Sequence, residues 1–211
     1  MGGAFITLEG IEGVGKSTNL RFVEEMVAGQ GRAARVTREP GGTPLGERVR
    51  EWVLEGEHTT LSAEVEALLM FAARAHHLDQ VIRPALAGGQ WVICDRFTDA
   101  TLAYQGGGRG ADMGWLESLK AAVHKGLQPD LTLLFDAPVD VGRGRISGRD
   151  QDHFEREDNA FFERVRQTYL SIAATDPRRV RIIDAAQELR DVQQQVTEIL
   201  DSFFERFKPT W

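Results

Sequence analysis

Cysteine, excess positive charge and long apolar runs are all scarce in this chain of 211 residues. The one cysteine, Cys94, cannot form an internal disulfide and lies in the apolar run 91–94, so a buried hydrophobic role is favoured over a catalytic thiol. The formal net charge of −7 argues against a protein that coats nucleic acid, because such a protein needs a cationic face. No stretch has the length of a membrane span, which argues against a membrane protein.

Export signals are lacking as well. The N-terminus has no charged n-region or cleavage site before the apolar run 5–8, so we expect a cytoplasmic protein. The composition, 42% hydrophobic and 27% charged, is that of an ordinary globular protein. Since no repeat or linker divides the chain, residues 1–211 are expected to form one domain whose core needs no disulfide.

A phosphate-binding pattern, G-x-x-x-x-G-K-[ST], occupies residues 10–17. Its glycines allow backbone torsions that turn successive N–H groups inward to form an anion site. Lys16 adds a positive charge for the outer phosphates, and the hydroxyl of Ser17 is placed for Mg²⁺. A strand before the pattern and an amphipathic helix after it favour an ATP site over a flexible loop. The residues expected to contact ATP are Gly10, Ile11, Glu12, Gly13, Val14, Gly15, Lys16, Ser17 and Thr18.

Short apolar runs alternate with longer helical stretches along the chain. This alternation predicts an α/β fold of three layers, a five-stranded parallel sheet flanked by helices. The runs are continuous rather than alternating, which is typical of strands covered on both faces. Because ligands gather at the carboxyl ends of parallel strands, the functional residues are sought there. The expected strands are residues 5–8, 34–37, 91–94, 131–135 and 180–183.

Charged residues follow two of the expected strands. Asp95 and Arg96 come directly after a buried strand, where charges are costly unless something binds them. We expect Asp95 to lie near Mg²⁺ and Arg96 to hold an anion in a bidentate manner. Arg38 and Glu39 end another strand, which brings them beside the phosphate loop if the two strands are neighbours. A surface ion pair on a turn is the alternative, but the position of these two residues at the carboxyl end of a strand favours a role in the site.

A long helical stretch over residues 62–86 carries Phe71 and Arg74 on one side. From spacing alone, we expect Phe71 to lie at the edge of the core and Arg74 to face solvent. A site in which the pair stacks on a base and hydrogen-bonds its edge is the alternative. The apolar face of the helix is expected to consist of Val65, Leu68, Leu69, Ala72 and Ala73. The glycine cluster at 106–110 is interpreted as a flexible loop, because no strand leads into it.

Arginines and glycines also mix over residues 142–156. Arg143, Arg145 and Arg149 on such a segment indicate a lid that brings positive charge onto a transferring phosphoryl group, with a solvated basic loop as the alternative. A GTPase switch is disfavoured because N-K-x-D and D-x-x-G are absent. Arginines in three separate loops favour a kinase with an anionic second substrate. Another nucleoside monophosphate kinase and an ATP-binding regulatory module stay open.

Several segments together resemble the thymidylate kinases of bacterial type, and the resemblance covers essentially the whole chain. It rests on residues 8–18, 37–43, 69–76, 95–97 and 103–109. The resemblance implies a P-loop kinase fold and transfer of the ATP γ-phosphoryl group to dTMP, with Mg²⁺, as a step toward dTTP. It also implies a cytoplasmic homodimer.

The same resemblance assigns roles to individual residues. Phe71 would stack on thymine and Arg74 would bind its O4 edge, which reverses the preference from spacing. The substrate contacts implied for dTMP are Glu12 at the 3′-hydroxyl, Arg38 and Arg96 at the phosphate, Tyr104 at ribose C2′, and Thr101 and Gln105 at the polar edge of the base. The implied catalytic set is Lys16, Arg38, Asp95, Arg96, Arg143 and Arg149, with Ser17 and Asp95 at the metal. Eukaryotic members carry an arginine in the phosphate loop where this chain has Gly13, so the lid arginines take over here.

Overall fold

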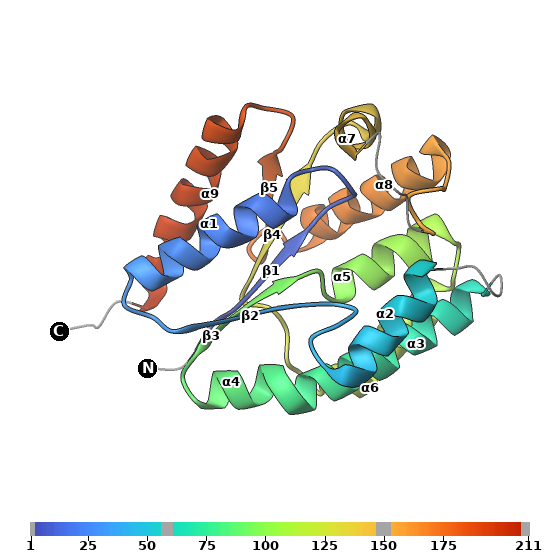
Figure 1. The fold of residues 1–211 in the computed structure, drawn as a ribbon, viewed down its shortest axis with the longest axis horizontal. Helices are drawn as coiled ribbons and strands as arrows, with labels where there is room; N and C mark the ends of the chain where they lie inside the picture. Colours follow the sequence, from blue (N-terminus) through green and yellow to red (C-terminus); the bar gives the residue numbers. More distant parts are fainter. Residues whose placement is uncertain (1–2, 56–60, 147–152, 208–211) are drawn as a thin grey trace.

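Five parallel strands form one sheet in the order β2-β3-β1-β4-β5 (Figure 1). The computed structural model describes residues 3–55, 61–146 and 153–207. The strands are β1 (Phe5–Glu9), β2 (Ala34–Arg38), β3 (Trp91–Asp95), β4 (Leu131–Asp136) and β5 (Val180–Asp184). The predicted sheet is confirmed, and each strand runs one residue further than its apolar run. That last residue is charged in all five strands, so the carboxyl edge of the sheet is polar from the outset.

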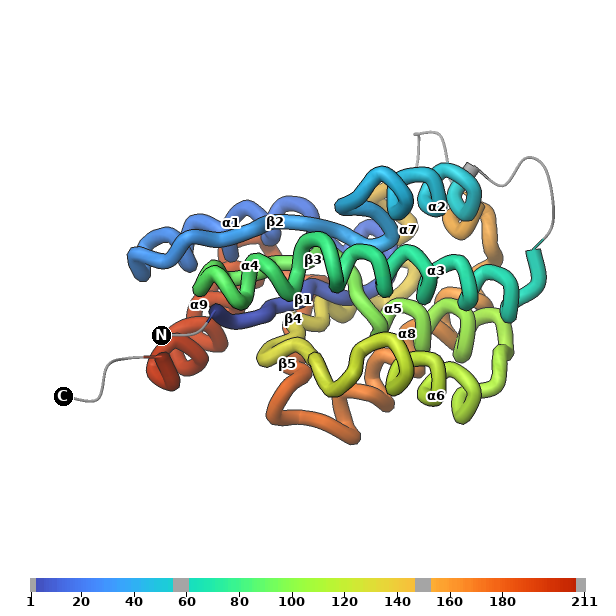
Figure 2. The backbone as a smooth tube through the Cα atoms, turned by 90° about the horizontal axis from the view of Figure 1, so that it is seen from below, coloured from blue at the N-terminus to red at the C-terminus, as the bar shows by residue number. Residues whose placement is uncertain are grey.

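Helices cover both faces of the sheet and make the three layers (Figures 1 and 2). One face carries α1 (Lys16–Gly29) and α9 (Leu189–Phe204), and the other carries α3 (Ala63–His77), α4 (Arg83–Ala87), α6 (Met113–His124) and α8 (Asn159–Thr175). α2 (Pro44–Glu55) packs on α3. The remaining elements are η1 (Leu78–Ile82), α5 (Thr98–Thr101), η2 (Leu102–Gly108), α7 (Val139–Ile146) and η3 (Glu205–Phe207). Within these described ranges, no helix is long and apolar enough to span a bilayer.

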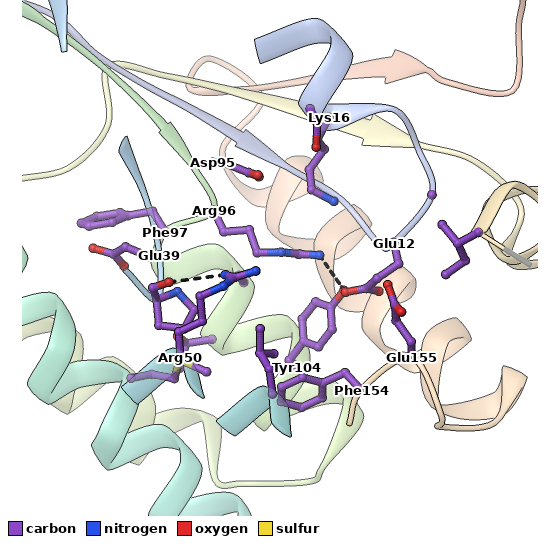
Figure 3. A pocket seen from close by; sticks show the side chains of 18 of the residues that line it. Glu12, Lys16, Glu39, Arg50, Asp95, Arg96, Phe97, Tyr104, Phe154 and Glu155 are labelled. Carbon is purple, nitrogen blue, oxygen red and sulfur yellow. Dashed lines mark hydrogen bonds and ion pairs between the residues drawn. The ribbon is translucent and has the colours of Figure 1, made fainter. Parts of the chain in front are cut away.

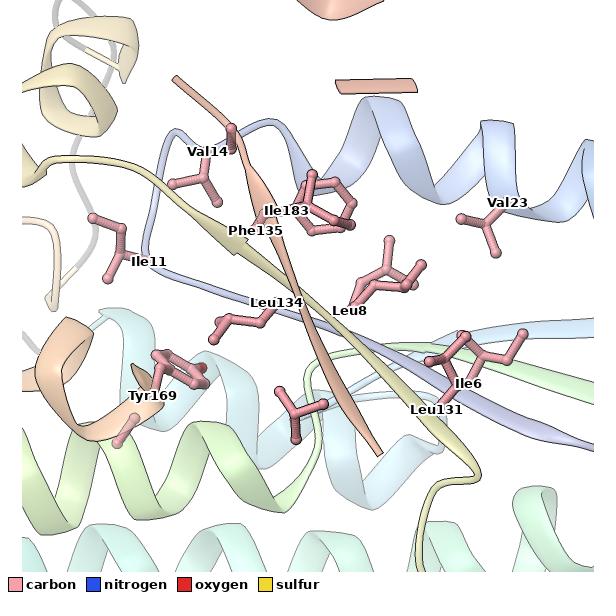
Figure 4. Packing of buried hydrophobic residues seen from close by; sticks show 14 of the residues in the cluster. Ile6, Leu8, Ile11, Val14, Val23, Leu131, Leu134, Phe135, Tyr169 and Ile183 are labelled. Atoms are coloured by element: carbon pink, nitrogen blue, oxygen red, sulfur yellow. The ribbon is translucent and has the colours of Figure 1, made fainter. Parts of the chain in front are cut away.

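The main core lies where β1 and β4 meet the flanking helices. Every residue of β1 is buried, and Ile6 and Leu8 have no exposed surface. Their side chains pack with Val23 of α1 and with Phe135 and Ile183 of the neighbouring strands (Figure 4). Because β1 is fixed on both faces and both edges, the loop that follows it starts from a rigid base.

The predicted apolar face of α3 is confirmed for two of its five residues and wrong for the other three. Ala73 is buried and Leu69 packs against the core, but Val65 is 42% exposed, Leu68 is 50% exposed, and Ala72 is exposed as well. The helix instead buries a side that mixes apolar and charged residues, namely Glu66, Ala67, Met70, Phe71, Ala73, Arg74 and His77. Charged groups can be buried here because partners on other elements pair with them. The described residues therefore leave Val65 and Leu68 exposed.

The interpretation of residues 106–110 as a flexible loop is also wrong. Gly106 and Gly108 are buried in η2, a wide helical turn that packs against α8. A Cβ at Gly107 would lie 1.9 Å from the Thr168 hydroxyl, and one at Gly108 would lie 2.5 Å from the Phe161 ring. The glycines therefore serve close packing of two helical elements rather than flexibility.

Candidate active site

One cavity of about 730 Å³ opens at the carboxyl ends of β1 and β3 (Figure 3). Its walls come from the phosphate loop, from the segment after β3, and from α2, α3, η2 and the two described ends of the lid. β3 lies between β2 and β1, so the second strand does not neighbour the phosphate loop. Even so, Glu39 lines the cavity, because its backbone N–H donates to the carbonyl of Asp95 (2.9 Å) at the end of β3.

The phosphate loop has the expected backbone shape. Gly10, Gly13 and Gly15 all have positive φ, which other residues rarely adopt. Ile11 and Val14 are buried in the hydrophobic core, so only their backbone can face a nucleotide. The predicted ATP contacts that line the cavity directly are Glu12, Gly13, Gly15, Lys16, Ser17 and Thr18.

Lys16 is buried at the floor of this loop. Its ammonium donates to the carbonyl oxygens of Gly10 (3.0 Å) and Ile11 (2.7 Å). Burial, with a smaller contribution from the positive charge of Arg96, lowers the pKa of Lys16 to about 8. Any anionic phosphate that enters the loop therefore stabilises the charged form of this buried ammonium.

Arg96 links the phosphate loop to the rest of the cavity. It holds a left-handed backbone conformation, with φ at 65°, and the Cys94 thiol donates to its carbonyl at 3.0 Å. The guanidinium donates to Glu12 Oε1 (2.8 Å), to the carbonyl of Gly10 (2.9 Å) and to Tyr104 Oη (3.1 Å). Burial opposes its charge, but the nearby Tyr104 and Glu12 raise its pKa, so it stays cationic. Cys94 is fully buried, as predicted.

Tyr104, which lies on η2, belongs to the same hydrogen-bonded group as Arg96 and Glu12. Its hydroxyl donates to the Glu12 carboxylate at 2.7 Å, and Phe154 lies edge-on to its ring at a centroid distance of 5.5 Å. Figure 3 shows Arg96, Glu12 and Tyr104 converging from three separate elements. The side chain of Glu12 is thereby fixed in the middle of the cavity.

The far end of the cavity presents another arginine. Arg74 is 2% exposed, and it donates through Nε to Glu39 (2.7 Å) and through Nη2 to the Phe97 carbonyl (3.2 Å) and to Thr101 Oγ1 (3.0 Å). Its Nη1 is buried and finds no hydrogen-bond partner in the part of the chain that the structure describes. Arg74 itself lines the cavity, so Nη1 is the nitrogen of this guanidinium that keeps its hydrogen-bonding capacity for a ligand.

The other residues predicted for dTMP divide into two groups. Thr101, Tyr104 and Gln105 line the cavity together with Arg74. Phe71 does not, because it lies beneath the guanidinium of Arg74, whose Cζ is 4.9 Å from its ring centre. Met70 occupies the cavity wall instead. Arg38 also lies outside the wall, where its side chain is 52% exposed and paired with Glu47.

The predicted metal ligands fit Mg²⁺. Asp95 lines the cavity, and its Oδ1 is buried without a hydrogen-bond partner among residues 3–55, 61–146 and 153–207. Ser17 lies exposed at the start of α1. A carboxylate and a hydroxyl are the hard oxygen ligands that Mg²⁺ prefers, and Mg²⁺ takes its other ligands from phosphate and water. Within the described ranges no cluster of acids, histidines or cysteines could hold a metal without such help.

The lid is described only at its two ends. Arg145 lines the cavity, and its guanidinium also donates to the carbonyl of Ala185 (2.8 Å). Arg143 is turned away from the cavity wall, with its guanidinium on the carbonyl of Glu157 (2.5 Å) and over the Phe162 ring. Arg149 lies outside the described residues.

Arg50 is a site residue that sequence reasoning missed. It extends from α2 into the cavity, where burial and the positive charge of Arg38 lower its pKa. Arg48 lies two residues earlier on the same helix, 79% exposed and paired with Glu51. The sequence holds no signal that separates these two arginines, because the difference comes only from how α2 packs on α3.

A phosphate loop that faces a second cationic half of one cavity, on a five-stranded parallel sheet, defines the P-loop nucleotide kinases as the class of this protein. The family model described as Thymidylate kinase matches residues 8–196. The chain belongs to the thymidylate kinase family, a family of phosphotransferases.

Relatives agree with this assignment. A thymidylate kinase of Alcanivorax borkumensis is 52% identical, covering 95% of this chain and 97% of its own length. One of Pseudomonas putida is 54% identical, covering 98% and 99% respectively. Among solved structures, the thymidylate kinase from Ehrlichia chaffeensis matches with a TM-score of 0.76 at 32% identity, over 95% of this chain and 99% of that one.

Proposed function

We propose that this protein transfers the γ-phosphoryl group of ATP to dTMP, with Mg²⁺, giving dTDP and ADP. The observation that carries the proposal is that two residues lining one cavity each have a buried polar atom without a partner among the described residues. These atoms are Asp95 Oδ1, on a residue close to Lys16 of the phosphate loop (Figure 3), and Arg74 Nη1. A buried polar atom without a partner costs free energy, so each group favours a ligand that satisfies it.

The base is assigned to the end with Arg74. A free guanidinium nitrogen donates to an acceptor such as O4 of thymine, whereas cytosine presents an amino group at that position. Thr101 and Gln105 lie at the polar edge of the base. Because Phe71 is covered by Arg74, we place the face of the base against Met70, and Phe71 acts by supporting the guanidinium.

The phosphoryl groups are assigned to the other end. Arg96 and Arg50 hold the acceptor phosphate, while Lys16 and the loop N–H groups hold the donor. The acceptor phosphate is already an anionic nucleophile, so the transfer needs alignment and charge neutralisation rather than a strong general base. Arg145 and Arg149 supply further positive charge from the lid.

The test is a survey of acceptors. ADP release from ATP is measured with dTMP, dUMP, dCMP, dGMP and dAMP in turn, with and without Mg²⁺. We expect dTMP to be preferred and the reaction to require Mg²⁺. Preference for another monophosphate would assign the cavity to a different kinase, and no transfer to any would favour an ATP-binding regulatory module.

Tyr104 is expected to exclude ribonucleotides. The phenol hydroxyl of Tyr104 donates to the Glu12 carboxylate at 2.7 Å, and this hydrogen bond holds the ring in place. The ring therefore cannot move aside to make room for the 2′-hydroxyl of a ribonucleotide. Tyr104→Ala should therefore lower the preference for dTMP over its ribose analogue by about tenfold or more, roughly the value of one steric contact. Tyr104→Phe, which keeps the ring, is the control. The steric account is wrong if both variants keep the wild-type ratio of kcat/KM values.

We also propose that the protein is a cytoplasmic homodimer. Exposed apolar side chains lie on three helices, α2, α3 and α6, of which α3 lies between the other two (Figure 2). They include Trp52 (69%), Leu68 (50%), Val65 (42%) and Met113 (41%). A patch of this kind marks an interaction surface. A second copy of this chain would cover it with the same residues.

Leu68→Glu should convert the dimer to a monomer. It places a charge on the uncovered face of α3 and leaves the buried face intact, so sedimentation should show half the wild-type mass at micromolar concentration. Leu189→Glu is the matched control, because Leu189 is 51% exposed on α9, on the other face of the sheet. An unchanged mass for Leu68→Glu would remove α3 from the interface.

A further inference from the structure

We infer that His77, which does not line the cavity, is a positioning residue for base recognition, and that it acts through Glu39 to fix the guanidinium of Arg74. The inference rests on the proposed function, because it assumes that Arg74 contacts the base. His77 has no exposed surface, so it cannot contact a ligand itself. Its effect on selectivity must pass through its neighbours.

Hydrogen bonds join His77 to Arg74 in one chain. His77 Nδ1 lies 2.9 Å from Glu39 Oε1, and Arg74 Nε lies 2.7 Å from the other carboxylate oxygen of Glu39. A carboxylate only accepts, so Nδ1 of His77 carries the proton. In the neutral ring, Nε2 then accepts from the hydroxyl of Thr37, 2.7 Å away. In that form each donor of this hydrogen-bond network meets one acceptor.

The hydrogen bonds of Arg74 fix the orientation of its guanidinium. Nε is held by Glu39, and Nη2 is held by the Phe97 carbonyl and Thr101. Only Nη1 remains, and it is buried without a partner among the described residues, on a side chain that lines the cavity. The rings of Phe71 and Phe97 lie 4.9 and 5.2 Å from Cζ. If Glu39 turned, the guanidinium would lose the contact that sets its rotation, and Nη1 would no longer be aimed.

The surroundings of His77 leave it no other position. The loop after β2 packs directly on its hydrogen bond to Thr37, since a Cβ at Gly42 would lie 2.5 Å from Thr37 Oγ1 and 2.6 Å from His77 Nε2. Glu39 is 4% exposed, so the loss of His77 leaves its Oε1 with little access to water. A buried carboxylate with one missing partner is costly and reorients or relaxes.

Two substitutions at position 77 separate the two hydrogen bonds. The amide nitrogen of Asn reaches the place of Nδ1, so His77→Asn retains the contact with Glu39 and loses the one with Thr37. The longer Gln reaches the place of Nε2, so His77→Gln retains Thr37 and loses Glu39. Both variants put an amide in the same buried site, and thermal unfolding measures the stability that each one loses.

The measurements are KM and kcat for dTMP and the ratio of kcat/KM between dTMP and dCMP. For His77→Gln we expect KM to rise about tenfold and the ratio to fall about tenfold, with kcat within about twofold, the pattern of a lost binding contact. His77→Asn should stay within about threefold of wild type in all three quantities. His76→Asn is the control, since His76 is the neighbouring, half-buried histidine on the same helix.

A double-mutant cycle distinguishes positioning from general loss of structure. In an Arg74→Ala background, His77→Gln should change kcat/KM by less than about twofold, because the group that it positions is gone. The inference is overturned if the tenfold effect persists in that background, or if the Gln and Asn variants behave alike. Should His77→Asn be unfolded, Thr37→Val takes its place, because it also removes only the contact with Thr37. Should His77→Gln be unfolded, His77→Phe takes its place, because it keeps an aromatic ring, loses the contact with Glu39 and is expected to show the same tenfold effects. If the wild type does not prefer dTMP, the proposed function fails before this test applies.

Discussion

Replacing Arg96 with alanine is expected to lower kcat/KM by roughly 10³-fold, the lower end of what an arginine on a transferring phosphoryl group contributes. The loss has two sources. The acceptor phosphate loses its cationic partner, and Glu12 and Tyr104 lose the guanidinium that ties them to the phosphate loop. Arg96→Lys should recover little, because an ammonium cannot make the fork of hydrogen bonds that a guanidinium makes.

Steady-state kinetics with ATP and dTMP measure this effect. Arg48→Ala serves as the matched control, because Arg48 is 79% exposed and lies outside the cavity wall. Its kcat/KM should stay within about twofold of wild type, as for most exposed surface positions. A loss below tenfold for Arg96→Ala would show that another arginine, such as Arg50, carries the acceptor phosphate.

Lys16→Met should lower kcat by roughly 10³-fold or more, because the phosphate-loop lysine neutralises charge that grows during transfer. Methionine has a similar length and no charge, so the fold should persist. Thermal unfolding tests the fold, and single-turnover ADP formation tests the chemistry. Near-normal turnover in a folded Lys16→Met protein would exclude Lys16 from catalysis.

The same lysine predicts a pH dependence. Its pKa in the folded protein is lowered to about 8, so the ammonium is present below pH 8 and is lost as the pH rises through that value. Donor phosphates bind the charged form, so KM for ATP should be flat from pH 6.5 to 7.5 and should rise about tenfold per pH unit well above pH 8. The KM of Lys16→Met should not show this rise. A flat KM up to pH 9.5 in the wild type would contradict the prediction.

The sequence predicted those parts of the site whose residues are close together in the chain. The phosphate loop and Arg96 directly follow a strand, and Asp95 ends one, so the position of the strand also places the side chain. Tyr104 and Gln105 were placed by their family motif, and the structure brings both into the cavity wall. Lys16 and Ser17 followed from the phosphate-binding pattern, and the structure starts α1 at Lys16.

The parts that could not be predicted depend on partners far away in the chain. A helical pattern alone assigns apolar residues to the core, yet α3 buries Glu66 and Arg74 and exposes Leu68. The reason is that Gln105 donates to Glu66 and that Glu39 accepts from Arg74, and both pairs span more than thirty residues. Spacing cannot reveal such pairs, and for the same reason it could not separate Arg50 from Arg48.

The close approach of the phosphate loop to the lid helix restricts how this enzyme can evolve. A Cβ at Gly13, where φ is +74°, would lie 1.9 Å from the carbonyl oxygen of Gly142 at the base of α7. Any side chain at position 13 is thus blocked by backbone rather than by a side chain that could turn aside. A substitution there requires α7 to move away from the phosphate loop first, so Gly13 sets how closely the loop and this helix can approach.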